Sequence, residues 1–133
     1  MFITKHTKNF LVIASFMMAL GVAIGAFGAH GLKATTDEYL MAIFHTGVQY
    51  HFYNTIALYG VALISYFLPN SKQIVIAGYL ILLGTILFSC SLYLLVLLKL
   101  SWIGIITPFG GTIMVISWVI IGFAIINELK VKE

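Results

Sequence analysis

The stretch IVIAGYLILLGTILFSCSLYLLVLL, residues 74–98, decides the fold class, because its 25 residues contain no charge. A helix of this length rises about 37 Å and can cross a hydrocarbon core of about 30 Å with some tilt. The whole 133-residue chain is also strongly apolar, with 62% hydrophobic and 8% charged residues. An ordinary soluble domain has about a quarter of its residues charged. We therefore expect lipid to surround most of the chain.

Three further apolar segments accompany this one, separated by short polar stretches. The expected spans are about residues 10–29, 46–68, 74–98 and 108–127. The first segment imitates a secretory signal peptide, with small residues at Ala26 and Gly28, but we interpret it as a retained signal anchor. The predicted fold is all-α: one domain over residues 1–133, forming a polytopic membrane protein with a four-transmembrane-helix up-and-down bundle.

Local motifs predict where two of the helices begin. Thr35 and Glu38 have the spacing of a capping box at the start of the second helix. Thr107, followed by a proline, predicts an N-cap for the fourth helix. Residues 102–106 are then either an interfacial or re-entrant stretch or the first part of a helix kinked at the proline.

The distribution of lysines predicts the orientation. With four spans, the two termini and the second turn share one side of the membrane. That side carries five of the seven lysines, Lys5, Lys8, Lys72, Lys130 and Lys132, and the other side carries Lys33 and Lys99. The positive-inside rule therefore predicts a multi-pass protein of the plasma membrane with both termini in the cytoplasm.

Small residues mark places where helices can approach closely. In the first span Gly21 and Gly25 are four residues apart, a spacing typical of helix packing within a chain or of a dimerisation face. The glycines assigned to helix packing are Gly21, Gly25, Gly28, Gly110 and Gly111. The glycines around His30 predict a helix terminus with left-handed backbone, where His30 either bonds free carbonyls or acts as a proton acceptor or ligand.

The second span carries the most polar side chains. His45 and Gln49 lie one helical turn apart, whereas His51 and Asn54 form a second stripe turned away from the first. His51 can face a headgroup, a neighbouring subunit or another helix. No carboxylate or thiolate accompanies these imidazoles at a ligand spacing, so we assign no metal site.

The third span adds a stripe of hydroxyl groups at Thr85, Ser89 and Tyr93, which serves either helix packing or a ligand. With both termini inside, most polar residues of the spans belong to the outer half of the membrane. We hypothesise that they form a polar pocket under the loop of residues 28–36. Its candidate residues are His30, His45, Gln49, Asn54, Ser89, Tyr93 and Thr107.

Four blocks of the sequence resemble a known family. They are Gly25-Ala26-Phe27-Gly28-Ala29-His30, Tyr50 with Thr55-Ile56-Ala57-Leu58, Leu87-Phe88-Ser89-Cys90-Ser91-Leu92-Tyr93, and Ile106-Thr107-Pro108-Phe109-Gly110-Gly111. The chain is similar over nearly its whole length to the small membrane proteins of unknown function typified by bacterial YgdD and YwdK (domain of unknown function 423), to which transmembrane protein 256 is related. The resemblance implies a four-span membrane protein and supplies no activity. Relatives often have histidine at Asn54 and glycine at Cys90.

These observations rank the function classes. The basic residues are all lysines at the ends of apolar runs, which does not fit a nucleic-acid partner. We expect a non-enzymatic protein, without cofactor or catalytic residue, that binds or passes a small molecule or lipid. The alternatives are an accessory or scaffold subunit of a membrane complex and a histidine-dependent membrane enzyme or redox carrier. The expected partners are membrane lipids, a small-molecule or lipid ligand, and a second copy or another membrane protein.

Overall fold

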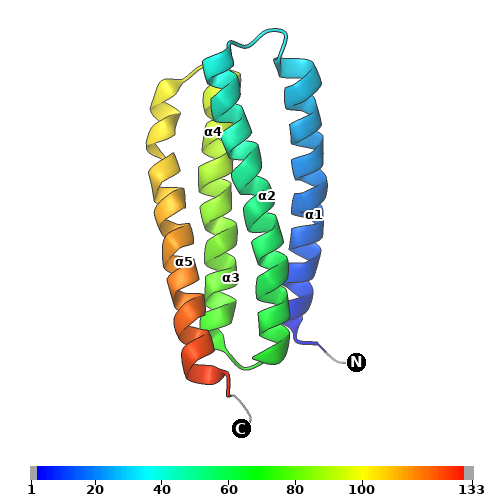
Figure 1. Cartoon of the computed structure of the whole chain (residues 1–133), viewed down its shortest axis with the longest axis vertical. Helices are drawn as coiled ribbons and strands as arrows, with labels where there is room; N and C mark the ends of the chain where they lie inside the picture. The colour runs from blue at the N-terminus through cyan, green and yellow to red at the C-terminus, as the bar shows by residue number, and fades with distance from the viewer. Residues whose placement is uncertain (1–2, 131–133) are drawn as a thin grey trace.

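The computed structural model describes residues 3–130, which form helices joined by short turns. Four helical columns lie side by side, and successive columns run in opposite directions (Figure 1). They are α1 (Lys5–Phe27) with the π-helical turn η1 (Gly28–Leu32); α2 (Glu38–Phe67); α3 (Lys72–Thr85), the π-helical turn η2 (Ile86–Cys90) and α4 (Ser91–Leu98); and the 3₁₀ helix η3 (Ser101–Ile105) with α5 (Thr107–Glu128). The prediction of an all-α fold is confirmed.

The order of packing follows the order of the chain. Helix α1 packs against α2, α2 against α3 and α4, and α3 against α5. The first turn of α1 and the last turn of α5 lie at the same end of the bundle (Figure 1). We call this the terminal end, and we call the other the loop end.

Three columns are long and apolar enough to cross a membrane: Lys5–Leu32, Lys72–Leu98 and Ser101–Glu128. Helix α2 is longer, with 30 residues, but it carries two histidines, Gln49 and Asn54 and is not apolar enough to be counted with these three. The outer surface of the bundle is also apolar: Phe16 is 74% exposed and Val115 is 65% exposed. Helices that are apolar on their outer faces are typical of a lipid environment.

Several helix boundaries differ from the predictions. The capping box was wrong: the side chain of Asp37 caps α2 by accepting from the Leu40 N–H at 2.9 Å, and the Thr35 hydroxyl donates to the carbonyl of Leu32. A carboxylate is a strong acceptor for the free N–H groups of a first turn. Helix α1 begins at Lys5, before the predicted span, because the Thr4 hydroxyl accepts from the N–H of Thr7.

The left-handed terminus predicted around His30 was also wrong. Gly28 has φ −58° and continues the column into a right-handed π turn. Among the described residues, only Lys99 has a positive φ, at 55°. The prediction of Thr107 as an N-cap was off by one residue, since Ile106 precedes α5 and Thr107 opens it. Ser101–Ile105 leads directly into that helix, which is closer to the kinked-helix alternative.

The apolar core consists of two clusters. The larger one, near the terminal end, joins α1, α2, α3 and α5 through Phe10, Ala14, Leu58, Val61, Ala62, Ile74, Ala77, Ile81, Ile121 and Ala124. The smaller one, near the loop end, contains Phe44, Tyr93 and Val96. Buried polar residues lie between the clusters along both α2 and the third column, namely His51, Asn54, Thr55, Thr85 and Ser89. This polar layer holds the candidate site.

Candidate functional site

A buried histidine occupies the polar layer where three columns meet. The Nε2 atom of His51 lies 2.9 Å from the carbonyl oxygen of Met17 on α1, and its Nδ1 lies 3.2 Å from the hydroxyl of Tyr93 on α4. Because a carbonyl oxygen only accepts, Nε2 carries the proton, and Nδ1 accepts the Tyr93 O–H. Both ring nitrogens are therefore engaged, and the imidazole joins α1, α2 and α4.

Two glycines create the space for this contact. A Cβ atom on Gly47 would lie 2.9 Å from the Cε1 atom of Tyr93, so glycine there allows the tyrosine ring to approach α2. A Cβ atom on Gly21 would lie 3.4 Å from the imidazole of His51 and 3.3 Å from Phe52. The close approach of α1 and α4 to α2 thus places both partners of His51.

Asn54 follows on α2 and presents an unused acceptor. Its side chain is buried, with 5% exposed, and its Nδ2 donates to the carbonyl of Tyr50 at 2.8 Å. This bond fixes the orientation of the amide, because only the nitrogen can donate to a carbonyl. The Oδ1 atom consequently points the other way, and it takes part in no hydrogen bond among residues 3–130.

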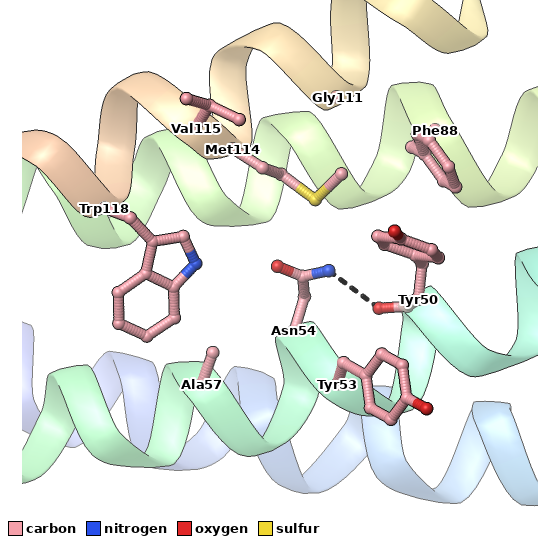
Figure 2. Close-up of a pocket in the computed structure, with 9 residues that line it drawn as sticks. All are labelled: Tyr50, Tyr53, Asn54, Ala57, Phe88, Gly111, Met114, Val115 and Trp118. Carbon is pink, nitrogen blue, oxygen red and sulfur yellow. Dashed lines mark hydrogen bonds between the residues drawn. The ribbon is translucent and has the colours of Figure 1, made fainter.

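The amide oxygen of Asn54 points into a pocket of about 370 Å³ between α2 and α5 (Figure 2). The pocket opens at the side of the bundle, where Tyr53 is 59% exposed and Val115 is 65% exposed. Within the described part of the chain, none of its nine lining residues is charged: Tyr50, Tyr53, Asn54, Ala57, Phe88, Gly111, Met114, Val115 and Trp118. A mostly apolar wall with a few polar groups is typical of a small-molecule pocket.

The back of the pocket is built on the π-helical turn η2, which supplies Phe88. The rings of Phe88 and Tyr50 pack with centroids 4.4 Å apart, which closes one end of the pocket. Helix α5 approaches this turn so closely that a Cβ atom on Gly110 would lie 2.5 Å from the backbone nitrogen of Phe88. The hydroxyl of Ser89 in the same turn is buried without a hydrogen-bond partner among the described residues. Such turns occur frequently at functional sites.

Comparison with known proteins identifies the family. A family model described as "Protein of unknown function (DUF423)" matches residues 24–111. The chain belongs to the DUF423 family. It is 39% identical to the UPF0382 membrane protein YwdK of Bacillus subtilis, over 92% of this chain and 99% of the relative. It is also 35% identical to the UPF0382 membrane protein SAB0533 of Staphylococcus aureus, over 86% of this chain and 92% of the relative. No solved structure matches the chain significantly.

The relatives are called membrane proteins, in agreement with the apolar columns of this DUF423 chain. The segment that matches the family model contains His51, Asn54, Tyr93 and Phe88. Trp118, on the opposite wall of the pocket, lies beyond it.

The structure separates the predicted site residues of this DUF423 chain into three groups. Asn54 and Ser89 are buried in the polar layer, and Tyr93 is buried in the smaller apolar cluster beside it. Thr107 is half-buried nearer the loop end, where its hydroxyl lies 2.7 Å from the Ser91 hydroxyl. The other three, His30, His45 and Gln49, are exposed on the outside of the bundle. Of the seven, only Asn54 lines the lateral pocket.

The glycines assigned to helix packing differ in how tightly they fit. A Cβ atom on Gly28 would collide with the ring of Phe44, and one on Gly110 with the backbone of η2. Added Cβ atoms on Gly25 and Gly111 would make ordinary contacts of 3.6 Å and 3.7 Å.

Two residues of the candidate site were not among the predicted site residues. The sequence left open which way the side chain of His51 faces, although its neighbours Asn54 and Thr55 are also buried. Trp118 was not considered, yet it lies in the middle of α5, away from the interfaces where tryptophan usually collects. That mid-helix position was the available signal. Residues 3–130 contain no group of three potential metal ligands.

Proposed function

We propose that this chain crosses the plasma membrane four times, with both termini in the cytoplasm. Helix α2 supports this proposal because it packs between α1 and α3, and its 30 residues extend over about 45 Å. The lysines support the orientation: Lys5, Lys8, Lys72 and Lys130 belong to the terminal end and Lys33 and Lys99 to the loop end. Lys132, assigned to the same side as the first group, lies outside the described residues.

We further propose that the protein binds or passes a small molecule or lipid through the lateral pocket between α2 and α5. The observation that carries this proposal is an uncharged pocket of about 370 Å³ with the free amide oxygen of Asn54 in its wall. A polar atom at membrane depth is costly without a partner, and a ligand can supply one. The exposed rim residues give such a ligand access from the bilayer.

A binding role fits the site better than catalysis does. General acid or base chemistry needs a titratable group that reaches the substrate. The imidazole of His51 is engaged at both nitrogens and does not line the pocket. The polar groups that do line it are tyrosine hydroxyls, an amide and an indole.

Filling the pocket tests this function. Gly111 lines the pocket and an added Cβ would have room there, so Gly111→Leu places a side chain in the cavity. The matched control is Gly122→Leu on the same helix, because a Cβ at Gly122 would meet nothing within 4 Å. We expect native mass spectrometry to detect a bound small molecule or lipid on the wild type and the control, and to lose it with Gly111→Leu. Equal retention by all three proteins would contradict the proposal.

The exposed polar side chains of α2 favour a second candidate function. The chain would then be an accessory or scaffold subunit of a membrane complex, or it would form a homo-oligomer. His45 and Gln49 lie one turn apart on the outer face of α2. Polar side chains at membrane depth usually face protein, so a partner helix would satisfy them. We expect Gln49→Leu to weaken chemical cross-linking of this face in native membranes, whereas Ile56→Leu, an exposed apolar change on the same helix, should not.

A further inference from the structure

In the lateral pocket an unpaired hydrogen-bond acceptor faces an unpaired donor (Figure 2). The first is the Oδ1 atom of Asn54, an acceptor whose direction is fixed by the bond from Nδ2 to Tyr50. The second is the indole N–H of Trp118, which can only donate and takes part in no hydrogen bond among residues 3–130. Figure 2 shows the two groups facing each other, Asn54 from α2 and Trp118 from α5.

A hydroxyl group satisfies both of these atoms at once. Its oxygen accepts from the N–H of Trp118, and its hydrogen is donated to Oδ1 of Asn54. An ester, ketone or ether oxygen only accepts, so it would leave Asn54 unpaired. A carboxylate would also place a charge in a wall without any compensating charge, at a high cost at membrane depth.

The rest of the pocket specifies what the hydroxyl is attached to. Ala57, Met114 and Val115 form apolar walls, and the rings of Tyr50 and Phe88 close the end beyond Asn54. The exposed residues at the rim of the pocket lie on the apolar outer surface of the bundle. That surface indicates that the rim faces lipid. An alkyl or isoprenoid chain can therefore extend from the pocket into the bilayer.

We propose that the ligand of the lateral pocket is an uncharged lipid alcohol, whose hydroxyl group bridges Trp118 Nε1 and Asn54 Oδ1. This inference rests on the proposed binding function and narrows it to one chemical class. Asn54 and Trp118 determine the specificity for the hydroxyl, and the apolar walls supply the contact with the chain. A free alcohol and the hydroxyl of a neutral glycerolipid share this chemistry, and competition with octanol and with a diacylglycerol distinguishes these two sources.

The fluorescence of Trp118 can report the binding directly. The other tryptophan, Trp102, is 61% exposed on η3 and does not line the pocket, so Trp102→Phe leaves Trp118 as the reporter. Bromine quenches a nearby indole, and the probes are bromohexanol, its methyl ether and bromohexane. In nanodiscs we expect saturable quenching by bromohexanol at about one tenth of the concentration needed for its methyl ether, as expected for one further hydrogen bond away from water. Bromohexane makes neither bond and should bind most weakly.

Two variants distinguish quenching by a probe bound in the pocket from quenching by probes that only dissolve in the lipid. Asn54→Leu, of similar size, should remove the roughly tenfold preference for bromohexanol over its methyl ether. Trp118→Phe keeps Trp102 as a reporter outside the pocket, and its quenching should rise linearly and equally for all three probes. Because the ligand series alone tests the preference, the result does not depend on the folding of the Asn54 variant.

The outcomes distinguish this inference from the broader function. Saturable quenching of Trp118 with equal affinity for bromohexanol, its ether and bromohexane would overturn the hydroxyl assignment and leave the binding pocket standing. Non-saturable quenching by every probe, like that of Trp102, would overturn both. A preference for the alcohol over its methyl ether that survives Asn54→Leu would also overturn the assignment of Asn54 Oδ1 as its acceptor.

Discussion

The Nδ1 atom of His51 lies 3.2 Å from the hydroxyl oxygen of Tyr93, although 42 residues separate them in the sequence. With the bond from Nε2 to the carbonyl of Met17, this contact connects three of the four columns through one imidazole. Hydrocarbon supplies no substitute for such bonds, so the geometry of the polar layer depends on them. Asn54 lies less than one turn further along α2, and the same helix rotation that buries His51 also places Asn54 at the pocket.

The first prediction is that His51 and Tyr93 are coupled energetically. Tyr93→Phe removes one hydrogen bond and should lower the free energy of unfolding by about 0.5–1.5 kcal/mol. His51→Phe should cost about 1–3 kcal/mol, because it leaves the buried Tyr93 hydroxyl without its acceptor. The double variant should show a coupling of about 0.6 kcal/mol, measured by unfolding in mixed micelles. Tyr39→Phe, at a side chain that is 75% exposed, is the control. Additive effects of the two buried substitutions would show that the contact contributes nothing.

The second prediction contrasts two buried serines. The Ser117 hydroxyl donates to the carbonyl of Ala77 at 2.7 Å and joins α5 to α3, so Ser117→Ala should lower the stability by about 0.5–1.5 kcal/mol. The Ser89 hydroxyl is equally buried but has no partner among the described residues. Ser89→Ala removes an unsatisfied polar group and should leave the stability unchanged or raise it by about 1 kcal/mol. A loss with Ser89→Ala as large as that with Ser117→Ala would mean that Ser89 has a bound partner.

The fold class was predictable from the sequence because apolar runs and lysines mark the ends of membrane helices. Residues 74–98 fall within the third column, whose helical turns extend from Lys72 to Leu98. Helix starts were less predictable, because several side chains compete for the same free N–H groups. At α2, Asp37 caps the helix instead of Thr35, and at α5 the hydroxyl of Thr107 bonds to Ser91.

The composition of the site was harder to predict than the fold. In a soluble helix the apolar stripe shows which face is buried, but here apolar residues cover both the core and the outer surface. The sequence placed His45 and Asn54 on different stripes without showing which stripe faces inward. Packing decides this question: Gly47 admits the ring of Tyr93 on one side of α2, which leaves His45 and Gln49 outside.

The third prediction concerns the close approach of α5 to the π-helical turn η2. A Cβ atom on Gly110 would lie 2.5 Å from the backbone nitrogen of Phe88 and 2.7 Å from the carbonyl oxygen of Gly84. Backbone atoms cannot move aside as a flexible side chain can, so Gly110→Ala should lower the stability by about 1–3 kcal/mol. Gly122→Ala on the same helix meets nothing within 4 Å and should be neutral or stabilising by up to about 1 kcal/mol. Equal thermal stability of the two variants in detergent would contradict this packing.

The fourth prediction is that α2 crosses the membrane despite its polar residues. In a Cys90→Ser background, single cysteines at Lys33, Lys72 and Lys130 report the two ends of α2 and the end of α5. We expect a membrane-impermeant maleimide to label Lys33→Cys on intact cells, and the other two only after permeabilisation, because the lysine-rich end belongs inside. Labelling of Lys33→Cys and Lys72→Cys from the same side would show that α2 does not span the bilayer. Labelling of Lys72→Cys and Lys130→Cys alone on intact cells would instead reverse the orientation.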